Sequence, residues 1–151
     1  MEKREYHLAA IQLLAGYKKI WDGSTINLIL YCMVRNSWWD SVDNLNAECL
    51  SHFFLLYPQE TYITKYWYMH KSIWMQRSSI IFQKSYKEKT DVALLSENIL
   101  NASKSTNFFI QKAIGWALRE YAKTNKEWVI DFVANNNLPS LSKREAMKHL
   151  G

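Results

Sequence analysis

Two sets of residues in the sequence combine tryptophan with charged side chains at helical spacing. In the first, Trp39 and Asp43 are four residues apart, so on a helix they share one face. A ring beside a carboxylate attracts a cationic group, because the ring face offers a cation–π interaction and the acid a Coulomb attraction. The alternative is structural: Trp38 or Trp39 packs in the core, while Asp40 and Asp43 favour the positive end of the helix dipole.

The second set is basic and comes from two further segments. Arg77 follows Trp74 by three residues, and Lys112, Trp116 and Arg119 form one stripe on an expected helix. Basic residues interleaved with tryptophan suit contacts with phosphate and sugar. The alternative is a lysine stem lying over a packed tryptophan. Gly115 interrupts the same helix at a cost of about 1 kcal/mol relative to alanine, which predicts the close approach of another helix or of a ligand backbone.

Other catalytic signatures are absent from the sequence. There is no Walker loop, nucleophile elbow, dinucleotide fingerprint or EF-hand loop. The four histidines form no pair four residues apart, so we expect no metal and no cofactor. Cys32 and Cys49 form no C-x-x-C motif, which predicts a reduced, cytoplasmic setting. The longest apolar run, Phe53 to Tyr57, is far shorter than the roughly 20 residues that span a bilayer, so no membrane partner is expected.

The elements that position these residues are predicted to be helices. Glycine and proline together number only six of 151 residues, too few for a turn-rich β fold, and 48% hydrophobic residues argue against disorder. Apolar residues recur every three to four positions. This pattern predicts a first helix that ends near Trp21, a break at Asn36-Ser37, and further helices over 25–35, 38–57, 60–69, 71–86, 89–102, 106–122, 125–136 and 142–149.

A weak repeat supports a stacked helical fold. Trp39, Trp74 and Phe109 are separated by 35 residues each, and each lies early in the second helix of an expected pair. Helix pairs that recur at this spacing are typical of α-solenoids, whose neighbouring repeats share one continuous core. The sequence therefore predicts an all-α helical-repeat solenoid of about four helix pairs, folded as a single domain over residues 1–151.

The charge is distributed unevenly along the chain. Residues 1–75 carry seven basic and seven acidic side chains, whereas residues 76–151 carry 12 basic and seven acidic ones. The whole net charge of +5 therefore lies in the second half. A basic half attracts a polyanion such as nucleic acid, and the alternative is a solvated lysine-rich surface.

The sequence resembles the AlkD-like DNA alkylation repair glycosylases, which are built from HEAT-like helical repeats. The resemblance covers essentially the whole chain and is densest at four segments: Asn36 to Asp43, Ile73 to Arg77, Phe108 to Asn125 and Leu141 to His149. It implies a monofunctional enzyme, without metal or cofactor, that excises N3- and N7-alkylated purines from double-stranded DNA.

The resemblance also implies roles for individual residues. Asp43 would be the catalytic carboxylate, and Trp39 and Trp116 would form the aromatic cleft around the sugar of the lesion. Arg77 would hold backbone phosphate, and Lys112 and Arg119 are the further candidates for DNA contacts. An N-alkylated purine carries positive charge, so it leaves without a strong general acid, and the carboxylate and ring faces would stabilise the cationic sugar.

The match begins partway along the family's fold, so the N-terminal helices usual for the family are expected to be missing. An uncapped solenoid end exposes an apolar face, which predicts self-association through that end. A protein without those helices offers an alternative function, a DNA-binding or protein-interaction scaffold with impaired catalysis.

Overall fold

The structure is a computed structural model that describes residues 3–35 and 38–150, with side chains from residue 5 onward. The described residues form helices and turns with no strand, which confirms the all-α prediction. The chain divides into two compact units, Met1–Ile63 and Thr64–Gly151. The expected break at Asn36-Ser37 lies outside the described residues. The single domain over 1–151 stays a prediction.

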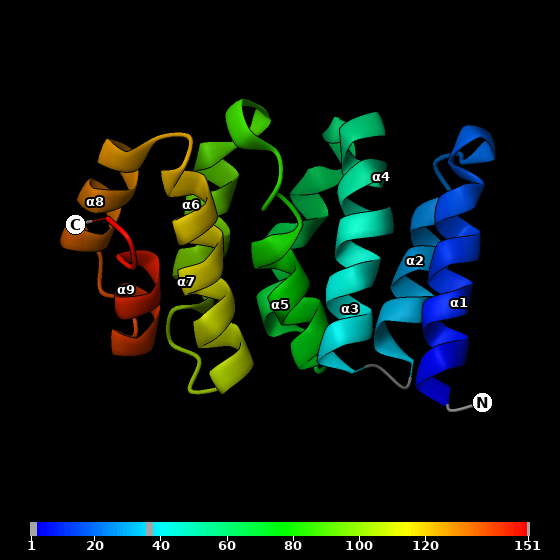
Figure 1. Ribbon diagram of the computed structural model, residues 1–151, viewed down its shortest axis with the longest axis horizontal. Helices are drawn as coiled ribbons and strands as arrows, with labels where there is room; N and C mark the ends of the chain where they lie inside the picture. The colour runs from blue at the N-terminus through cyan, green and yellow to red at the C-terminus, as the bar shows by residue number, and fades with distance from the viewer. Residues whose placement is uncertain (1–2, 36–37, 151) are drawn as a thin grey trace. The chain divides into compact units, whose positions relative to one another are not determined.

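Unit 1 is built around a long helical stretch that packs on two earlier helices. These are α1 (Lys3–Gly16) and α2 (Thr25–Val34), joined by a 3-10 turn at Lys18–Ile20 and drawn in blue in Figure 1. The stretch comprises α3 (Trp39–Leu45), a π-helical segment (Asn46–Leu50) and α4 (Ser51–Leu56). The core consists of side chains from all of these helices: Ile11, Ile29, Met33, Val42, Leu45, Cys49, Leu50, Phe53 and Phe54.

The π-helical segment corrects the prediction of one regular helix over 38–57. Within the segment the backbone widens to i→i+5 hydrogen bonding, a pattern often found at functional sites. The Asn46 side chain donates to the Val42 carbonyl at 3.0 Å and so caps a carbonyl where the bonding pattern changes. The sequence shows only apolar periodicity here, which does not distinguish π-helical from α-helical turns.

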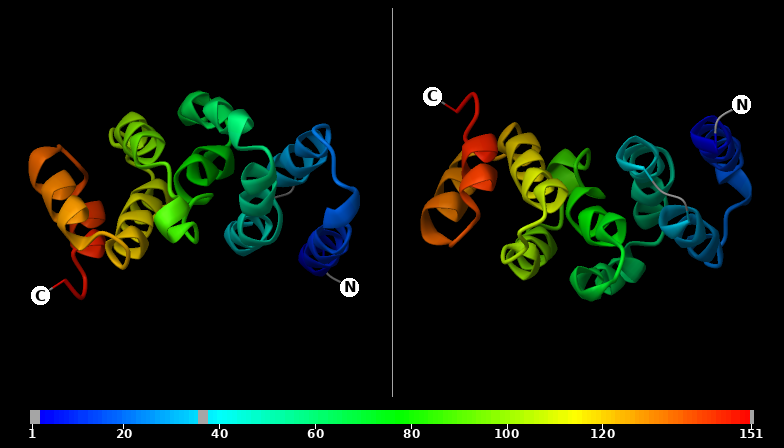
Figure 2. Two further views of the ribbon diagram at one scale, coloured as in Figure 1. Left: turned by 90° about the horizontal axis from the view of Figure 1, so that it is seen from above. Right: turned by 90° about the horizontal axis from the view of Figure 1, so that it is seen from below.

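Unit 2 packs around one buried helix. Helix α7 (Phe108–Ala122) contacts α5 (Ile73–Ile81), α8 (Lys126–Asn135) and α9 (Ser140–Ala146), and α5 also contacts α6 (Val92–Ala102). Figure 2 shows these helices from both ends, in green to red. The side chains of Ile110, Ala113, Ile114, Ala117 and Leu118 form the centre of this core.

Several predicted helix bounds are wrong at their ends. Residues Pro58–Met69 form a 3-10 helix rather than an α-helix, and a second short one covers Lys87–Lys89. The helix predicted over 71–86 ends at Ile81. The last helix begins directly after Pro139, whose fixed φ suits a helix start, and it ends at Ala146 instead of 149.

The 35-residue spacing corresponds to real helix starts. Trp39 is the first residue of α3, Trp74 the second of α5, and Phe109 the second of α7. In unit 2 the rings of Trp74 and Phe109 contact each other, with centroids 5.2 Å apart. Equivalent positions of these two successive repeats are thus neighbours, at partly buried sites, as expected for a helical-repeat fold.

Candidate functional site

The first part of the candidate site lies at the start of α3 in unit 1. The Trp38 N–H donates to the Ser41 hydroxyl at 3.2 Å, and that hydroxyl donates back to the Trp38 carbonyl at 3.0 Å. The Asp40 carboxylate accepts the Ser41 N–H at 2.8 Å. Ser41 and Asp40 therefore stabilise the first turn, and the turn determines where the following side chains point.

Trp39 and Asp43 occupy one side of α3, four residues apart. Trp38 and Trp39 are 57% and 50% exposed, so the alternative that one of them is a core residue is wrong. Asp43 is partly buried and lies in the last turn of α3, just before the π-helical segment begins at Asn46. Unit 1 thus presents an indole at its surface on the helix that also carries a carboxylate.

The second part lies in unit 2 around the indole of Trp116 on α7. The Arg77 guanidinium carbon is 5.6 Å from the centre of the Trp116 ring, and the Lys84 ammonium nitrogen is 3.9 Å from it. Both distances are within the range of a cation–π interaction. The structure therefore shows an indole whose ring attracts two cations, one from α5 and one from the turn after it.

Arg77 is held firmly in this arrangement. It is only 6% exposed, and its Nη1 donates to the Phe109 carbonyl at 2.7 Å, near the start of α7. A buried guanidinium with fixed partners keeps its orientation without losing rotamer entropy on binding. The predicted contact of Arg77 with phosphate stays a prediction.

Lys84 was not among the residues selected from the sequence. The helix predicted over 71–86 would place Lys84, seven residues after Arg77, on the same side, but α5 ends at Ile81 and Lys84 reaches the Trp116 ring from the turn that follows. The side chain also lines a cavity of about 390 Å³ between the turn after α5 and the last turns of α7. Lys87 and Lys123 line the same cavity.

Lys112 and Arg119 contact one carboxylate, that of Glu145 on α9. The distances are 3.2 Å for Lys112 and 3.1 Å for Arg119, and Lys148 contributes a third contact at 3.5 Å. The hydrogen bond from Lys112, with further attraction from Lys112 and Lys148, lowers the pKa of Glu145 below its usual value. Three cations around one anion leave positive charge beside Trp116 on α7.

Gly115 explains how Glu145 reaches this position. A Cβ at residue 115 would lie 2.5 Å from the Glu145 Cβ and 3.0 Å from the Ser142 carbonyl oxygen. Only glycine therefore permits α7 and α9 to approach this closely. The prediction of a close approach at Gly115 is confirmed, and the approaching group is a helix.

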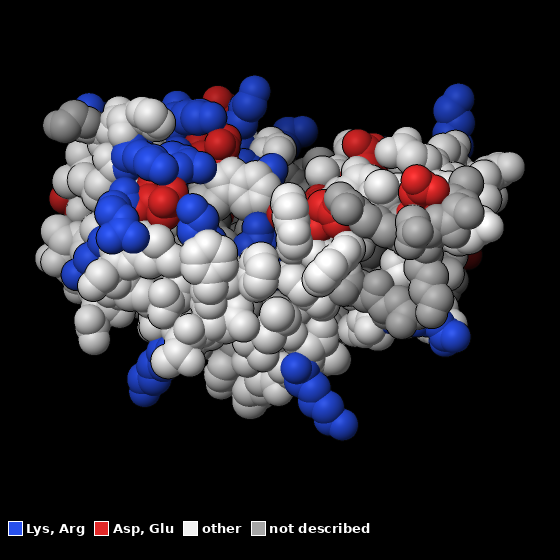
Figure 3. All heavy atoms as spheres, turned by 60° about the horizontal axis from the view of Figure 1, so that its bottom comes forward, with Lys and Arg blue, Asp and Glu red and all other residues white. Residues whose placement is uncertain are grey.

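Basic side chains gather over unit 2. Figure 3 shows Lys and Arg crowded over the C-terminal helices, at the left, with acidic side chains between them. Among the described residues there is no group of three or more His, Cys, Asp and Glu side chains that could hold a metal ion. No described helix is long and apolar enough to cross a membrane.

Together the side chains offer two kinds of chemistry. The cations of unit 2 attract phosphate, and those bonded to Glu145 are already oriented. The indole faces and the Asp43 carboxylate attract positive charge. Trp39 and Asp43 belong to unit 1, and Arg77, Lys112, Trp116 and Arg119 to unit 2.

Comparison with known proteins supports this interpretation. The family model for "DNA alkylation repair enzyme" matches residues 1–150. A solved structure of a predicted DNA alkylation repair enzyme from Enterococcus faecalis is 32% identical and superimposes with a TM-score of 0.91, covering 100% of this chain and 71% of that one. No curated protein sequence matches the chain.

Proposed function

Because the chain belongs to the DNA alkylation repair enzyme family, we propose that it is a glycosylase acting on duplex DNA. Its substrates are purines alkylated at N3 or N7, and the reaction is hydrolysis of the N-glycosidic bond. The proposal places the reaction on a HEAT-like repeat scaffold, with no metal and no cofactor.

The reaction requires little acid catalysis. Alkylation at a ring nitrogen gives the purine a positive charge, and the base departs as a neutral molecule when the bond from C1′ to the purine nitrogen breaks. The bonding electron pair leaves with the purine, so the positive charge passes to the sugar. Water then bonds to C1′ and releases a proton, which yields an abasic site and the free alkylpurine.

The residues take roles that suit their chemistry. The Asp43 carboxylate stabilises the cationic sugar and orients the attacking water. Trp39 in unit 1 and Trp116 in unit 2 each offer a ring face that can stabilise positive charge on the sugar. Arg77, Lys112 and Arg119 bind backbone phosphates, and we add Lys84 to this group because of its position at Trp116.

The observation that carries the proposal is the pair of cations at the Trp116 ring. Contacts of Arg77 and Lys84 with this ring support the proposal that the ring can also interact with a cationic sugar, if the sugar displaces the Lys84 ammonium. Lys112 and Arg119, which lie on the same helix as this indole, support the proposed binding to phosphate.

Release of 7-methylguanine from methylated duplex DNA tests the proposal. Under single-turnover conditions we expect release by the wild type and a loss of about 100–1,000-fold in rate for Asp43→Asn, which keeps the shape and removes the charge. Asp40→Asn is the matched control, because the Asp40 carboxylate bonds to the Ser41 N–H at the helix start. It should lower stability by about 0.3–1 kcal/mol and leave the rate nearly unchanged.

The outcomes separate the two candidate functions. Full activity of Asp43→Asn would remove Asp43 from the catalytic group. A wild-type protein that is folded and binds duplex DNA but releases no alkylpurine would favour the scaffold function instead. The basic surface of unit 2 is the feature that such a scaffold would share with the enzyme.

A further inference from the structure

The ring of Trp116 contacts two cations that the fold holds differently. The Arg77 guanidinium carbon lies 5.6 Å from the ring centre, and the Lys84 ammonium nitrogen lies 3.9 Å from it. Arg77 is 6% exposed and donates to the Phe109 carbonyl at 2.7 Å, whereas Lys84 is partly exposed and lies on the turn after α5. Arg77 is therefore fixed by its surroundings, while the flexible four-carbon stem of Lys84 has other rotamers within reach.

The Lys84 ammonium lies where the proposed function needs a cationic sugar. Trp116 is partly buried and packs against the hydrophobic core of unit 2, so only part of its ring surface can meet a ligand. At 3.9 Å from the ring centre the ammonium is in contact with the ring. A second cation at this place would meet both the volume and the charge of the first. A sugar that develops positive charge must therefore displace Lys84.

We propose that Lys84 is a displaceable cap on the Trp116 ring. In the protein alone its ammonium lies on the ring, and when a duplex binds, the ammonium moves to a backbone phosphate and leaves the ring to the sugar. Lys84 is then a positioning residue that acts through Trp116. The inference rests on the proposed function, because a DNA strand supplies both the phosphate and the sugar.

The surroundings of Lys84 allow such a movement. Its side chain lines the cavity of about 390 Å³, which is also lined by Lys87, Glu88, Glu120 and Lys123. The stem therefore has space beside the ring, and because the cavity carries both signs of charge, it does not repel an ammonium.

The strengths of the two contacts favour the exchange. A cation–π contact at an exposed site stabilises the capped position by a factor of about two to five. A hydrogen bond between an ammonium and a phosphate contributes a factor of about ten or more. The ring therefore keeps the Lys84 ammonium in the free protein, and a phosphate takes it when a duplex is bound.

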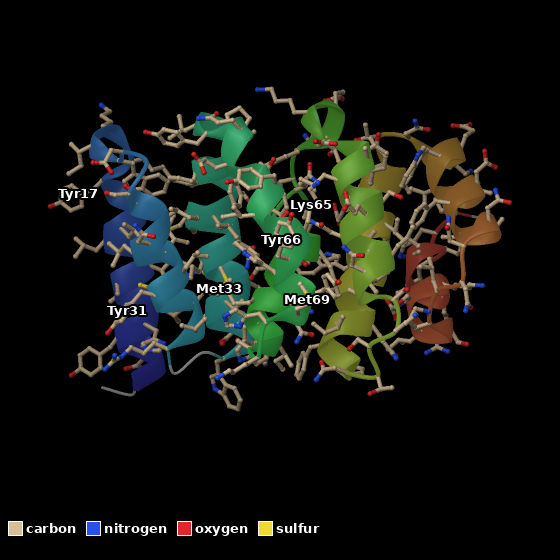
Figure 4. The ribbon with its side chains drawn as sticks, turned by 180° about the vertical axis from the view of Figure 1, so that it is seen from behind. Tyr17, Tyr31, Met33, Lys65, Tyr66 and Met69 are labelled. Atoms are coloured by element: carbon tan, nitrogen blue, oxygen red, sulfur yellow. The ribbon has the colours of Figure 1, made fainter. Side chains whose placement is uncertain are left out.

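NMR spectroscopy of the full wild-type chain with isotope-labelled lysine tests the proposal. The methylene protons next to the Lys84 ammonium should be shifted upfield by the ring current of Trp116, and Lys84→Met identifies their signal. On titration with a short undamaged duplex, we expect this signal to move to the position of an ordinary exposed lysine. The matched control is Lys65, which is also partly exposed in unit 2 but pairs with Glu97 at 3.8 Å, and its signal should not move. Figure 4 shows Lys65 beside Tyr66 on the 3-10 helix Pro58–Met69.

A double-mutant cycle gives a second readout that needs no catalysis. Trp116→Leu removes the ring, so a duplex that binds this variant no longer has to displace the cap. The effect of Trp116→Leu on affinity for undamaged duplex should therefore be about two to five times more favourable with Lys84 present than in the Lys84→Met background. The same cycle with Lys65→Met in place of Lys84→Met should show no coupling. Fluorescence anisotropy measures the four affinities of each cycle.

The outcomes separate this inference from the proposed function. A Lys84 signal that is not shifted in the free protein, or that stays shifted at saturating duplex, would overturn the cap, and so would a cycle without coupling. These results would leave the proposed function in place. Failure of the folded wild type to bind any duplex would overturn the proposed function, and the cap with it. The NMR titration uses the wild-type chain, so it decides the question even if Trp116→Leu does not fold.

Discussion

Lys84 determines what the Trp116 ring already contacts in the protein. Its ammonium lies closer to the Trp116 ring than the Arg77 guanidinium does, at 3.9 Å against 5.6 Å. The ring therefore already contacts a cation in the protein alone. Any cationic sugar that approaches the same face of Trp116 competes with this ammonium.

Lys84→Met keeps the stem and removes the charge. We expect the free energy of unfolding to fall by about 0.5–1 kcal/mol, the usual value of an exposed cation–π pair, and the indole N–H signal of Trp116 to shift in an NMR spectrum. The signal is assigned with Trp116→Phe. Lys89→Met, on the exposed 3-10 turn, should change neither quantity. An unchanged Trp116 signal in Lys84→Met would contradict the contact.

Glu145 predicts an acid-sensitive contact between α7 and α9. Its folded pKa lies below its ordinary value of 4.5, so the ionised form is stabilised by folding. This contribution is fully present above about pH 5 and is lost as the pH falls below 4.5 through the folded pKa. Glu145→Gln should lower the free energy of unfolding by about 1 kcal/mol at pH 7. At pH 3 the variant and the wild type should differ less, which denaturant titrations at both pH values would check.

At the scale of elements, the apolar pattern predicted most helices but not their ends. Helices α6, α7 and α8 agree with the predicted ranges within about three residues, because each begins at an Asp or Asn whose side chain accepts backbone N–H groups. The 3-10 and π-helical segments were missed, since they keep apolar residues every three to four positions and differ only in their hydrogen bonds.

The contact between α7 and α9 depends on Gly115. Gly115→Ala gains about 1 kcal/mol in helix propensity, but the added methyl overlaps with the Glu145 Cβ and the Ser142 carbonyl. Overpacking of this kind costs typically about 1–3 kcal/mol, so we expect a net loss of stability. Thermal melts would check it, with Gly16→Ala as the control, because a Cβ at Gly16 meets nothing within 4 Å. If Gly115→Ala and Gly16→Ala were equally stable, α9 would have to shift and make room for the added methyl group.

At the scale of the whole molecule, the distribution of charge along the chain could be predicted better than the contacts that the charged side chains make. The sequence locates the +5 excess in the second half, and the structure shows that part of this charge is bonded to Glu145. The partners of Lys112 and Arg119 could not be predicted, because Glu145 is 26 or more residues away in sequence. The structure places Trp39 at the surface of unit 1 and Arg77 beside the Trp116 ring in unit 2, and the functional roles of Trp39, Asp43, Arg77 and Trp116 stay predictions.

Duplex binding is expected to be strongly dependent on salt. If Arg77, Lys84, Lys112 and Arg119 each neutralise one phosphate, the affinity should fall roughly 100-fold between about 50 and 200 mM salt. Lys112→Gln should reduce the slope of log K against log salt by about one, while Lys18→Gln, in unit 1, should leave it unchanged. Fluorescence anisotropy with an undamaged duplex measures both slopes, and binding that is insensitive to salt would exclude the phosphate contacts.

The π-helical segment also affects which changes in length the chain tolerates. Such a segment holds one residue more than an α-helix of the same height, so a deletion there would restore regular hydrogen bonding. The deletion would nevertheless rotate everything after it by about 100° relative to α3, and Phe53 and Phe54 would leave the core. The protein should therefore tolerate a substitution at the exposed Ala47, whereas deletion of Ala47 would disrupt the core of unit 1. The orientation of Asp43 relative to α4 is thus set by the number of residues in this stretch as much as by their types.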